Sequence, residues 1–305
     1  MRQRLETALQ RHPTLMAQLR RMLIESPTFA KLMWVVRGQQ LVILDYPVTA
    51  KPRYGHGMPA HSGLNDLISE SDVSYSAFLE RALEYKAAFT DIPLRYRHVT
   101  SEPCWLNGWL PALDMVANYT LLAERRPGQY LEIGSGESTK LARRAIIDNG
   151  LPTRITSIDP NPRAEVDRLC DTVLRLRLED ANLSVFSDLQ PGDFLFFDGS
   201  HRCFMNSDVT VFFLEVLPNL AKGVVVGLHD IDLPWDYSPS WAGRFYNEQY
   251  MLAVYLLTRG RSEDIIFPAC YSTMTPKLET ILRPLWSDPR LTGVDPSGAS
   301  FWFTT

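Results

Sequence analysis

Acidic and histidine side chains recur in this sequence at the points where short apolar runs end. Asp159, Asp198 and the pair His229 and Asp230 each close such a run, and Asp180 follows a weaker one. His201 comes three residues after Asp198. Carboxylates at these positions can accept hydrogen bonds from a ligand, and a histidine can take up a proton near neutral pH. The pattern predicts a polar site built from the ends of several strands.

A glycine-containing segment is the second candidate for chemistry. Glu132, Gly134 and Gly136 follow the pattern (Glu/Asp)-x-Gly-x-Gly, with Ser135 between the glycines. The glycines allow a tight turn and close approach of a ligand, and the helix expected next offers free N–H groups. A dinucleotide fingerprint needs a third glycine where the chain has Thr139. An acid at 132 suits a ligand with an ammonium group better than a pyrophosphate; the alternative is a tight turn and nothing more.

The elements that must position these residues alternate between strand and helix from residue 128 onward. Such alternation is typical of a doubly wound α/β fold with a mostly parallel sheet, which binds ligands at the C-terminal ends of its strands. A last aromatic strand leaves no room for a crossover helix, which indicates an antiparallel insertion. The predicted strands cover 129–133, 154–159, 172–178, 193–198, 223–230, 264–271 and 298–305.

The chain before this alternation has a helical pattern. We therefore expect a mainly helical N-terminal extension over residues 1–126 and a ligand-binding domain over 127–305. Helices are predicted at 74–90 and 111–125, and the extension is expected to cap the C-terminal edge of the sheet. The reason is that an α/β unit of this kind supplies a cofactor cradle but little acceptor pocket.

Two N-terminal segments leave alternatives open. A basic amphipathic helix within residues 1–37 either packs on its own domain, which we favour, or lies on a membrane surface. An aromatic loop with Trp105, Asn107 and Trp109 either walls a ligand site or packs against the sheet edge.

Composition excludes several classes of protein. The 305 residues carry a net charge of −4 and a pI of about 5.9, so a broad nucleic-acid face is not expected. Four cysteines lie far apart without a C-x-x-C pair, which fits a cytoplasmic protein without a disulfide framework. Since no run reaches the roughly 18 apolar residues of a membrane span, no transmembrane segment is expected.

At this point the sequence resembles class I methyltransferases that use S-adenosylmethionine (SAM), over about residues 128–305. The resemblance implies a seven-stranded Rossmann-like sheet of order 3-2-1-4-5-7-6. It also implies that Glu132 holds the ammonium group of SAM through solvent, that Gly134, Ser135 and Gly136 admit the cofactor, that Asp159 binds the ribose hydroxyls, and that Asp180 lies near the adenine amino group. Ser138, where a third glycine is common, departs from the pattern.

Within that class, the segments around Asp198 and Asp230 resemble small-molecule O-methyltransferases of the family-24 and cephalosporin-hydroxylase-like branch. Several members hold Mg²⁺ with an acid after strand 4 and an acidic pair after strand 5. Asp198 and Asp230 match these acids, whereas His229 stands where an acid is expected and would suit Mn²⁺, Fe²⁺ or Zn²⁺ better than Mg²⁺. We therefore expect either a divalent metal, Mg²⁺ or Mn²⁺, or protonated His201 to neutralise the two carboxylates.

The sequence thus predicts a SAM-dependent methyltransferase that acts on a hydroxyl oxygen of a small molecule, a sugar or a natural-product intermediate. His201 or His229 is the expected base. His229 reaches the site only if strand 5 ends before it; inside the strand, alternation would turn it to the other face. The alternatives are a nicotinamide-dependent oxidoreductase and a non-catalytic protein that keeps the fold. Homo-oligomerisation is left open.

Overall fold

The structure, a computed structural model, describes residues 42, 46, 48–96 and 101–305. The chain divides into two compact units, Met1–Ala50 and Lys51–Thr305. The amphipathic helix predicted within residues 1–37 lies outside the described residues.

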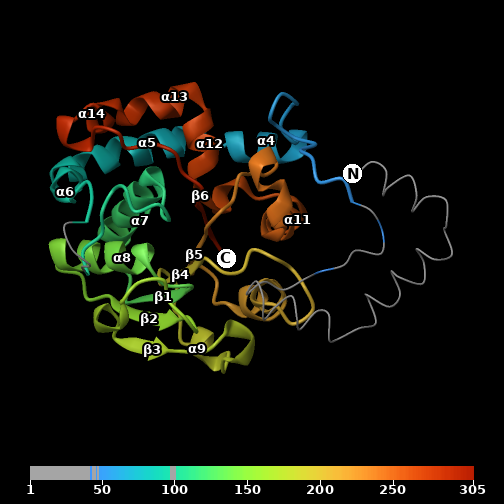
Figure 1. Cartoon of the computed structure of the whole chain (residues 1–305), viewed down its shortest axis with the longest axis horizontal. Coiled ribbons are helices and arrows are strands. Elements are labelled where there is room, and N and C mark those ends of the chain that lie inside the picture. The colour runs from blue at the N-terminus through green and yellow to red at the C-terminus, as the bar shows by residue number, and fades with distance from the viewer. Residues whose placement is uncertain (1–41, 43–45, 47, 97–100) are drawn as a thin grey trace, which may run out of the picture. The chain divides into compact units, whose positions relative to one another are not determined.

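A seven-stranded sheet forms the centre of this unit, in the order β3-β2-β1-β4-β5-β7-β6 (Figure 1). This is the predicted order. β7 pairs antiparallel with both β5 and β6, whereas the other pairs are parallel, which confirms the expected antiparallel insertion. The strands are β1 (Gln129–Ile133), β2 (Arg154–Ile158), β3 (Thr172–Leu174), β4 (Phe194–Phe197), β5 (Val225–Leu228), β6 (Ile265–Pro268) and β7 (Phe301–Thr304).

The strands β4 and β5 consist of apolar residues and glycine, as expected for strands covered on both faces. All four residues of β4 are buried, as are all four of β5. Gly227 in β5 faces Trp302 in β7, and a Cβ at Gly227 would lie 2.6 Å from the indole ring. The glycine therefore makes room for the largest buried side chain of the core.

Helices flank the sheet. α7 packs against α8, α5 and α12, and the short helices near the C-terminus lie beside α5 (Figure 1). Among the described residues, none of the helices is long and apolar enough to cross a membrane. The helices are α4 (Ser62–Ser69), α5 (Asp72–Ala82), α6 (Lys86–Asp91), α7 (Ala112–Arg125), α8 (Glu137–Asp148), α9 (Ser184–Ser187), α10 (Asp208–Val211), α11 (Glu248–Arg259), α12 (Ala269–Met274), α13 (Pro276–Glu279) and α14 (Arg283–Trp286).

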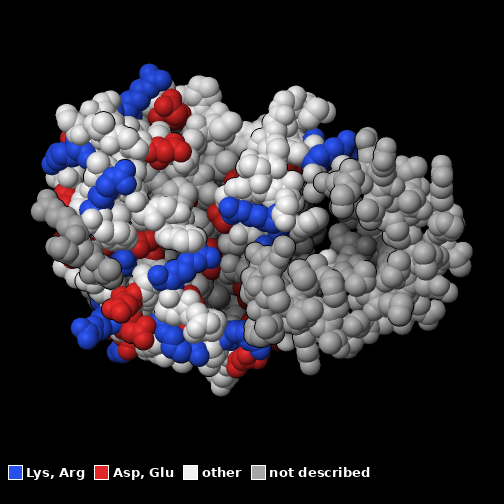
Figure 2. Space-filling model, in the orientation of Figure 1, with Lys and Arg blue, Asp and Glu red and all other residues white. Residues whose placement is uncertain are grey.

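Two predictions about the N-terminal part can be compared with these elements. The helix predicted at 74–90 is present, but it is interrupted by a 3-10 turn at Leu83–Tyr85 between α5 and α6. The helix predicted at 111–125 corresponds to α7. The domain boundary at 126/127 stays a prediction. Figure 2 shows acidic and basic side chains intermixed over the described part of the face in view.

Candidate active site

The predicted glycine turn joins β1 to α8. Gly134 has a φ of 80°, in the left-handed region that favours glycine. An added Cβ there would overlap the backbone carbonyl oxygen of Asp198, so the turn lies directly against the end of β4. Gly136 immediately precedes α8, and an added Cβ there would meet nothing within 4 Å. Glycine at 134 is required by packing, whereas the space beside Gly136 is open to a ligand.

Asp159 follows β2 and holds the turn in place. Its Oδ2 accepts a hydrogen bond from the Ser135 N–H at 2.8 Å, and its Oδ1 accepts one from the Asn161 N–H at 2.7 Å. Each carboxylate oxygen keeps a further lone pair that a ligand hydroxyl could use. The ribose role of Asp159 stays a prediction, and the structure adds that this residue also orders the turn.

Glu132 in β1 is fully buried. The Thr139 hydroxyl donates to its Oε2, and the Tyr130 hydroxyl donates to its Oε1 at 3.4 Å. Burial raises the pKa of Glu132 to about 7, although the hydroxyl groups around it act in the opposite direction. Its carboxyl group is therefore engaged by the protein, and its contact with an ammonium group stays a prediction.

Asp180 has a different environment. It ends a 3-10 turn at Leu178–Asp180, its side chain is 52% exposed, and it forms an ion pair with Arg177 at 2.7 Å. Its role near adenine stays a prediction.

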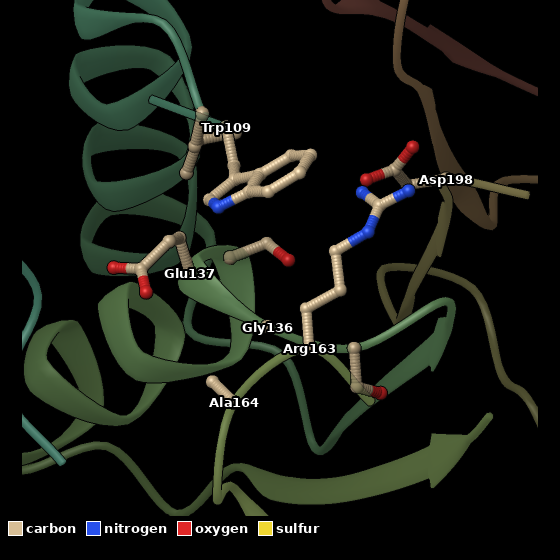
Figure 3. A pocket seen from close by; sticks show the side chains of 9 residues that line it. Trp109, Gly136, Glu137, Arg163, Ala164 and Asp198 are labelled. Atoms are coloured by element: carbon tan, nitrogen blue, oxygen red, sulfur yellow. The ribbon is translucent and has the colours of Figure 1, made fainter. Parts of the chain in front are cut away.

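An open pocket lies beside the glycine turn (Figure 3). Ser135, Gly136 and Ser138 line one side, and Asp198 lines another. Trp109 also lines the pocket. This position agrees with the alternative in which the aromatic loop walls a ligand site. By contrast, Trp105 is buried and donates to the Phe89 carbonyl oxygen at 3.1 Å.

Arg163, in the segment after β2, is a pocket residue that sequence reasoning missed. Its guanidinium carbon lies 4.4 Å from the centre of the Trp109 ring. Figure 3 shows the guanidinium group pointing toward Asp198. An arginine in a loop without a motif carries no signal by which the sequence could have singled it out.

Four predicted site residues converge beyond the ends of β4 and β5. His201 Nε2 lies 3.2 Å from Asp198 Oδ1 and 3.4 Å from Asp230 Oδ2. His229 Nδ1 lies 3.5 Å from an oxygen of each of the same two carboxylates. Since β5 ends at Leu228, His229 lies past the strand end and reaches the site.

Two buried carboxylates lie on the far side of the histidines, and sequence reasoning missed both. Glu248 Oε2, at the start of α11, is 2.9 Å from His201 Nδ1. Asp114 Oδ2, in α7, is 3.3 Å from His229 Nε2. Asp114 also accepts hydrogen bonds from the Ala299 and Ser300 N–H groups, which fixes its position. Each histidine therefore has a carboxylate on both of its ring nitrogens.

These contacts determine the charges of the cluster. Burial acts to lower the pKa of both histidines, but the surrounding carboxylates outweigh it and raise the pKa well above the usual value. Burial would raise the pKa of Asp198, yet His229 and His201 lower it far below its usual range. Burial raises the pKa of Glu248 to about 7. Both histidines therefore tend to be protonated at neutral pH, beside ionised Asp198.

The arrangement bears on the metal prediction. Within the part of the chain that the structure describes, no group of three or more histidine, cysteine and acidic side chains is arranged to hold a metal ion. Imidazole nitrogens instead lie between Asp198 and Asp230. As placed, the side chains do not fit a metal centre, and the metal role of the two aspartates stays a prediction.

The comparisons with known proteins agree with the geometry. Residues 131–231 match the model of a protein family, Methyltransf_24, described as a methyltransferase domain. None of the curated proteins searched matches the chain.

Several solved structures are similar at low identity. They include the plantazolicin methyltransferase BpumL with S-adenosylhomocysteine (SAH), at 12% identity and a TM-score of 0.37, covering 79% of this chain and 98% of that chain. The SAH-bound methyltransferase PaMTH1 of Podospora anserina has 16% identity, a TM-score of 0.33 and coverages of 82% and 98%. An O-methyltransferase of Bacillus cereus with SAH has 17% identity, a TM-score of 0.32 and coverages of 80% and 99%. Because these TM-scores are low, the structural similarities carry no argument about the class of the protein. That assignment depends on the family match and the sheet order.

The match over residues 131–231 is to a methyltransferase domain of the family-24 type, and the sheet order is the one expected for class I SAM-dependent methyltransferases. These findings support methyltransferase activity, and SAM as the cofactor stays a proposal.

Proposed function

We propose that this methyltransferase transfers a methyl group to a hydroxyl oxygen of a small molecule, with His201 as the base. One observation supports the proposal: Asp198 lines the pocket beside the glycine turn and also lies 3.2 Å from His201 Nε2. A proton acceptor therefore lies next to the place where the cofactor is expected.

When bound, SAM supplies a methyl group already activated by its sulfonium. His201 Nε2 would take up the proton that the acceptor hydroxyl loses when its oxygen is methylated. The protein's share is to align the hydroxyl, exclude water and take up that proton.

Glu248 supports this role of His201. Its Oε2 faces His201 Nδ1, so it fixes the ring orientation and stabilises the imidazolium that forms when Nε2 takes a proton. Because the pKa of Glu248 is raised to about 7, this carboxyl group can also share the proton of the pair near neutral pH.

A base must be neutral before it can act, and the pKa of His201 is raised. We therefore expect the rate of methyl transfer to increase with pH through the pKa of the Glu248–His201 pair. A rate independent of pH above neutrality would argue against a titrating base in this site.

The direct test compares two equivalent substitutions. His201→Asn suits the positive φ of 59° at this position and removes the base. We expect SAH formation with a panel of phenols and sugars to fall by ~10²–10⁴-fold, with the affinity for SAH retained. The control is His61→Asn, because His61 caps α4 and accepts from the Leu64 N–H, which asparagine can also do. Wild-type rates in His201→Asn would refute the proposed base.

Neither alternative class gains support. A nicotinamide-dependent oxidoreductase has no observation in its favour, and the methyltransferase match points elsewhere. A small-molecule acceptor, the absence of a nucleic-acid partner, a cytoplasmic location and the oligomeric state stay predictions.

A further inference from the structure

Two arginine side chains contact the aromatic ring that packs against the proposed base. The guanidinium carbon of Arg202 is 4.8 Å from the centre of the Tyr246 ring, and that of Arg244 is 5.5 Å from it. The His201 ring lies 4.6 Å from the same tyrosine ring. One aromatic ring is therefore shared by the imidazole and two positive charges.

This arrangement is held by hydrogen bonds between two segments. Arg202 donates from Nε to the Arg244 carbonyl oxygen at 2.9 Å. The Asn247 N–H donates to the His201 carbonyl oxygen at 3.0 Å, and the Asn247 side chain accepts from the Cys203 N–H at 2.6 Å. The arginines are thus tied to the same backbone that carries His201.

Neither arginine has an acidic partner among the described residues. Arg259 provides the contrast, because it lies 5.1 Å from the Tyr255 ring and also pairs with Asp264 at 2.8 Å. Two like charges that share one ring repel each other, and an anion that both contact would relieve the repulsion.

The neighbouring rings add a surface for a planar group. Trp241 packs 5.7 Å from Tyr246 and 6.3 Å from Tyr237, measured between ring centres, and Arg244 lies 4.0 Å from the Trp241 ring. Aromatic and guanidinium groups together favour ligands that are both planar and anionic.

We propose that the methyl acceptor carries an anionic group, a carboxylate or a phosphate, bound by Arg202 and Arg244 while its hydroxyl group lies at His201. This inference rests on the proposed function of His201 and narrows its substrate class to hydroxylated aromatic anions.

The test measures binding to the SAH-saturated full-length protein by calorimetry. The probes are benzoate, phenyl phosphate and neutral benzamide, which share a ring and differ in charge. We expect at least one anion to bind ~10-fold or more tightly than benzamide, as expected for hydrogen bonds to a charged group. The two anionic arms distinguish a carboxylate from a phosphate.

Variants locate the binding. Arg202→Gln and Arg244→Gln should each remove most of the preference for the anion, with SAH affinity unchanged. Arg259→Gln, at a stacked arginine with an acidic partner, should keep it. The inference is overturned if benzamide binds as well as the anions, if neither anion binds at millimolar concentration, or if the preference survives in the Arg202→Gln/Arg244→Gln double variant. Failure of the wild type to bind SAH would instead count against the cofactor site.

Discussion

Gly134 and Gly136 stand two residues apart in one turn, yet a side chain would have opposite effects at the two positions. At Gly134 an added Cβ would overlap the Asp198 carbonyl oxygen, whereas at Gly136 it would enter open space that lines the pocket. The first glycine therefore serves the fold and the second serves the ligand.

We predict that Gly134→Ala lowers the free energy of unfolding by about 2 kcal/mol or more, because the backbone must move. Gly136→Val should change it by at most about 1 kcal/mol but block SAH binding. Urea unfolding and calorimetry on both variants check this. Normal SAH affinity in Gly136→Val would contradict the placement of the cofactor beside this turn.

Asp159 and Asp180 form a second matched pair. Asp159→Ala should weaken SAH binding by about 1.5–3 kcal/mol, since it removes a charged acceptor and frees the Ser135 N–H. Asp180→Ala removes an exposed residue and should change stability by less than about 0.5 kcal/mol. Calorimetry on both variants measures how much each aspartate contributes to the free energy of SAH binding. Unchanged affinity in Asp159→Ala would remove this residue from the ribose role.

At the scale of elements, β4 and β5 bring Asp198, His201, His229 and Asp230 together. The sequence predicted this because parallel strands end at one edge, and acids or histidines close successive apolar runs. It could not predict Glu248 or Asp114. An acid in the first turn of a helix is common for helix-dipole reasons alone, and Asp114 contacts residues some 185 positions away.

The buried histidines and glutamates near the ends of β4 and β5 should make the free energy of unfolding depend on pH. Because the pKa of His201 and His229 is raised in the folded state, their contribution is complete below the unfolded value near 6.5 and is lost as pH rises through the folded values. The pKa values of Glu132 and Glu248 are raised to about 7 in the folded state. These two groups therefore lower the free energy of unfolding as pH rises toward neutrality. Urea unfolding between about pH 7.5 and 8 therefore reports mainly the histidines, because the cysteine thiols, whose pKa is also raised, lower stability only at higher pH. Stability that stays constant or rises there would contradict the charged cluster.

Metal removal separates the two ways of neutralising Asp198 and Asp230. With imidazoles between the carboxylates, we expect Tm and methyl transfer to survive treatment with a strong chelator. Elemental analysis before treatment, and add-back of Mg²⁺, Mn²⁺ and Zn²⁺ afterwards, complete the experiment. If activity is lost on chelation and restored by Mn²⁺ or Zn²⁺, the two aspartates bind a metal ion. His201 would then not be the only group that neutralises their charge.

At the scale of the whole molecule, the sheet order followed from the sequence, whereas the acceptor side did not. The order rests on local alternation and a family resemblance, which the sequence contains. The acceptor side depends on loops such as 236–246, whose aromatic residues and arginines meet only after folding. Neither the spacing of these residues nor their type marks them as a group.

One loop that precedes the sheet in sequence lines the candidate site. Trp109 and Leu110 line the same pocket as Ser135 and Asp198, although they precede the sheet in sequence. The helical cap expected over residues 1–126 stays a prediction.

The measurement that tests the account most directly is a crystal structure of the full-length protein with SAH. We predict that the SAH sulfur lies between the Ser135–Gly136 turn and Asp198. His201 Nε2 should face the side from which the methyl group leaves. A sulfur atom remote from Asp198, or separated from His201 by a wall of side chains, would contradict the proposed base and the mechanism built on it.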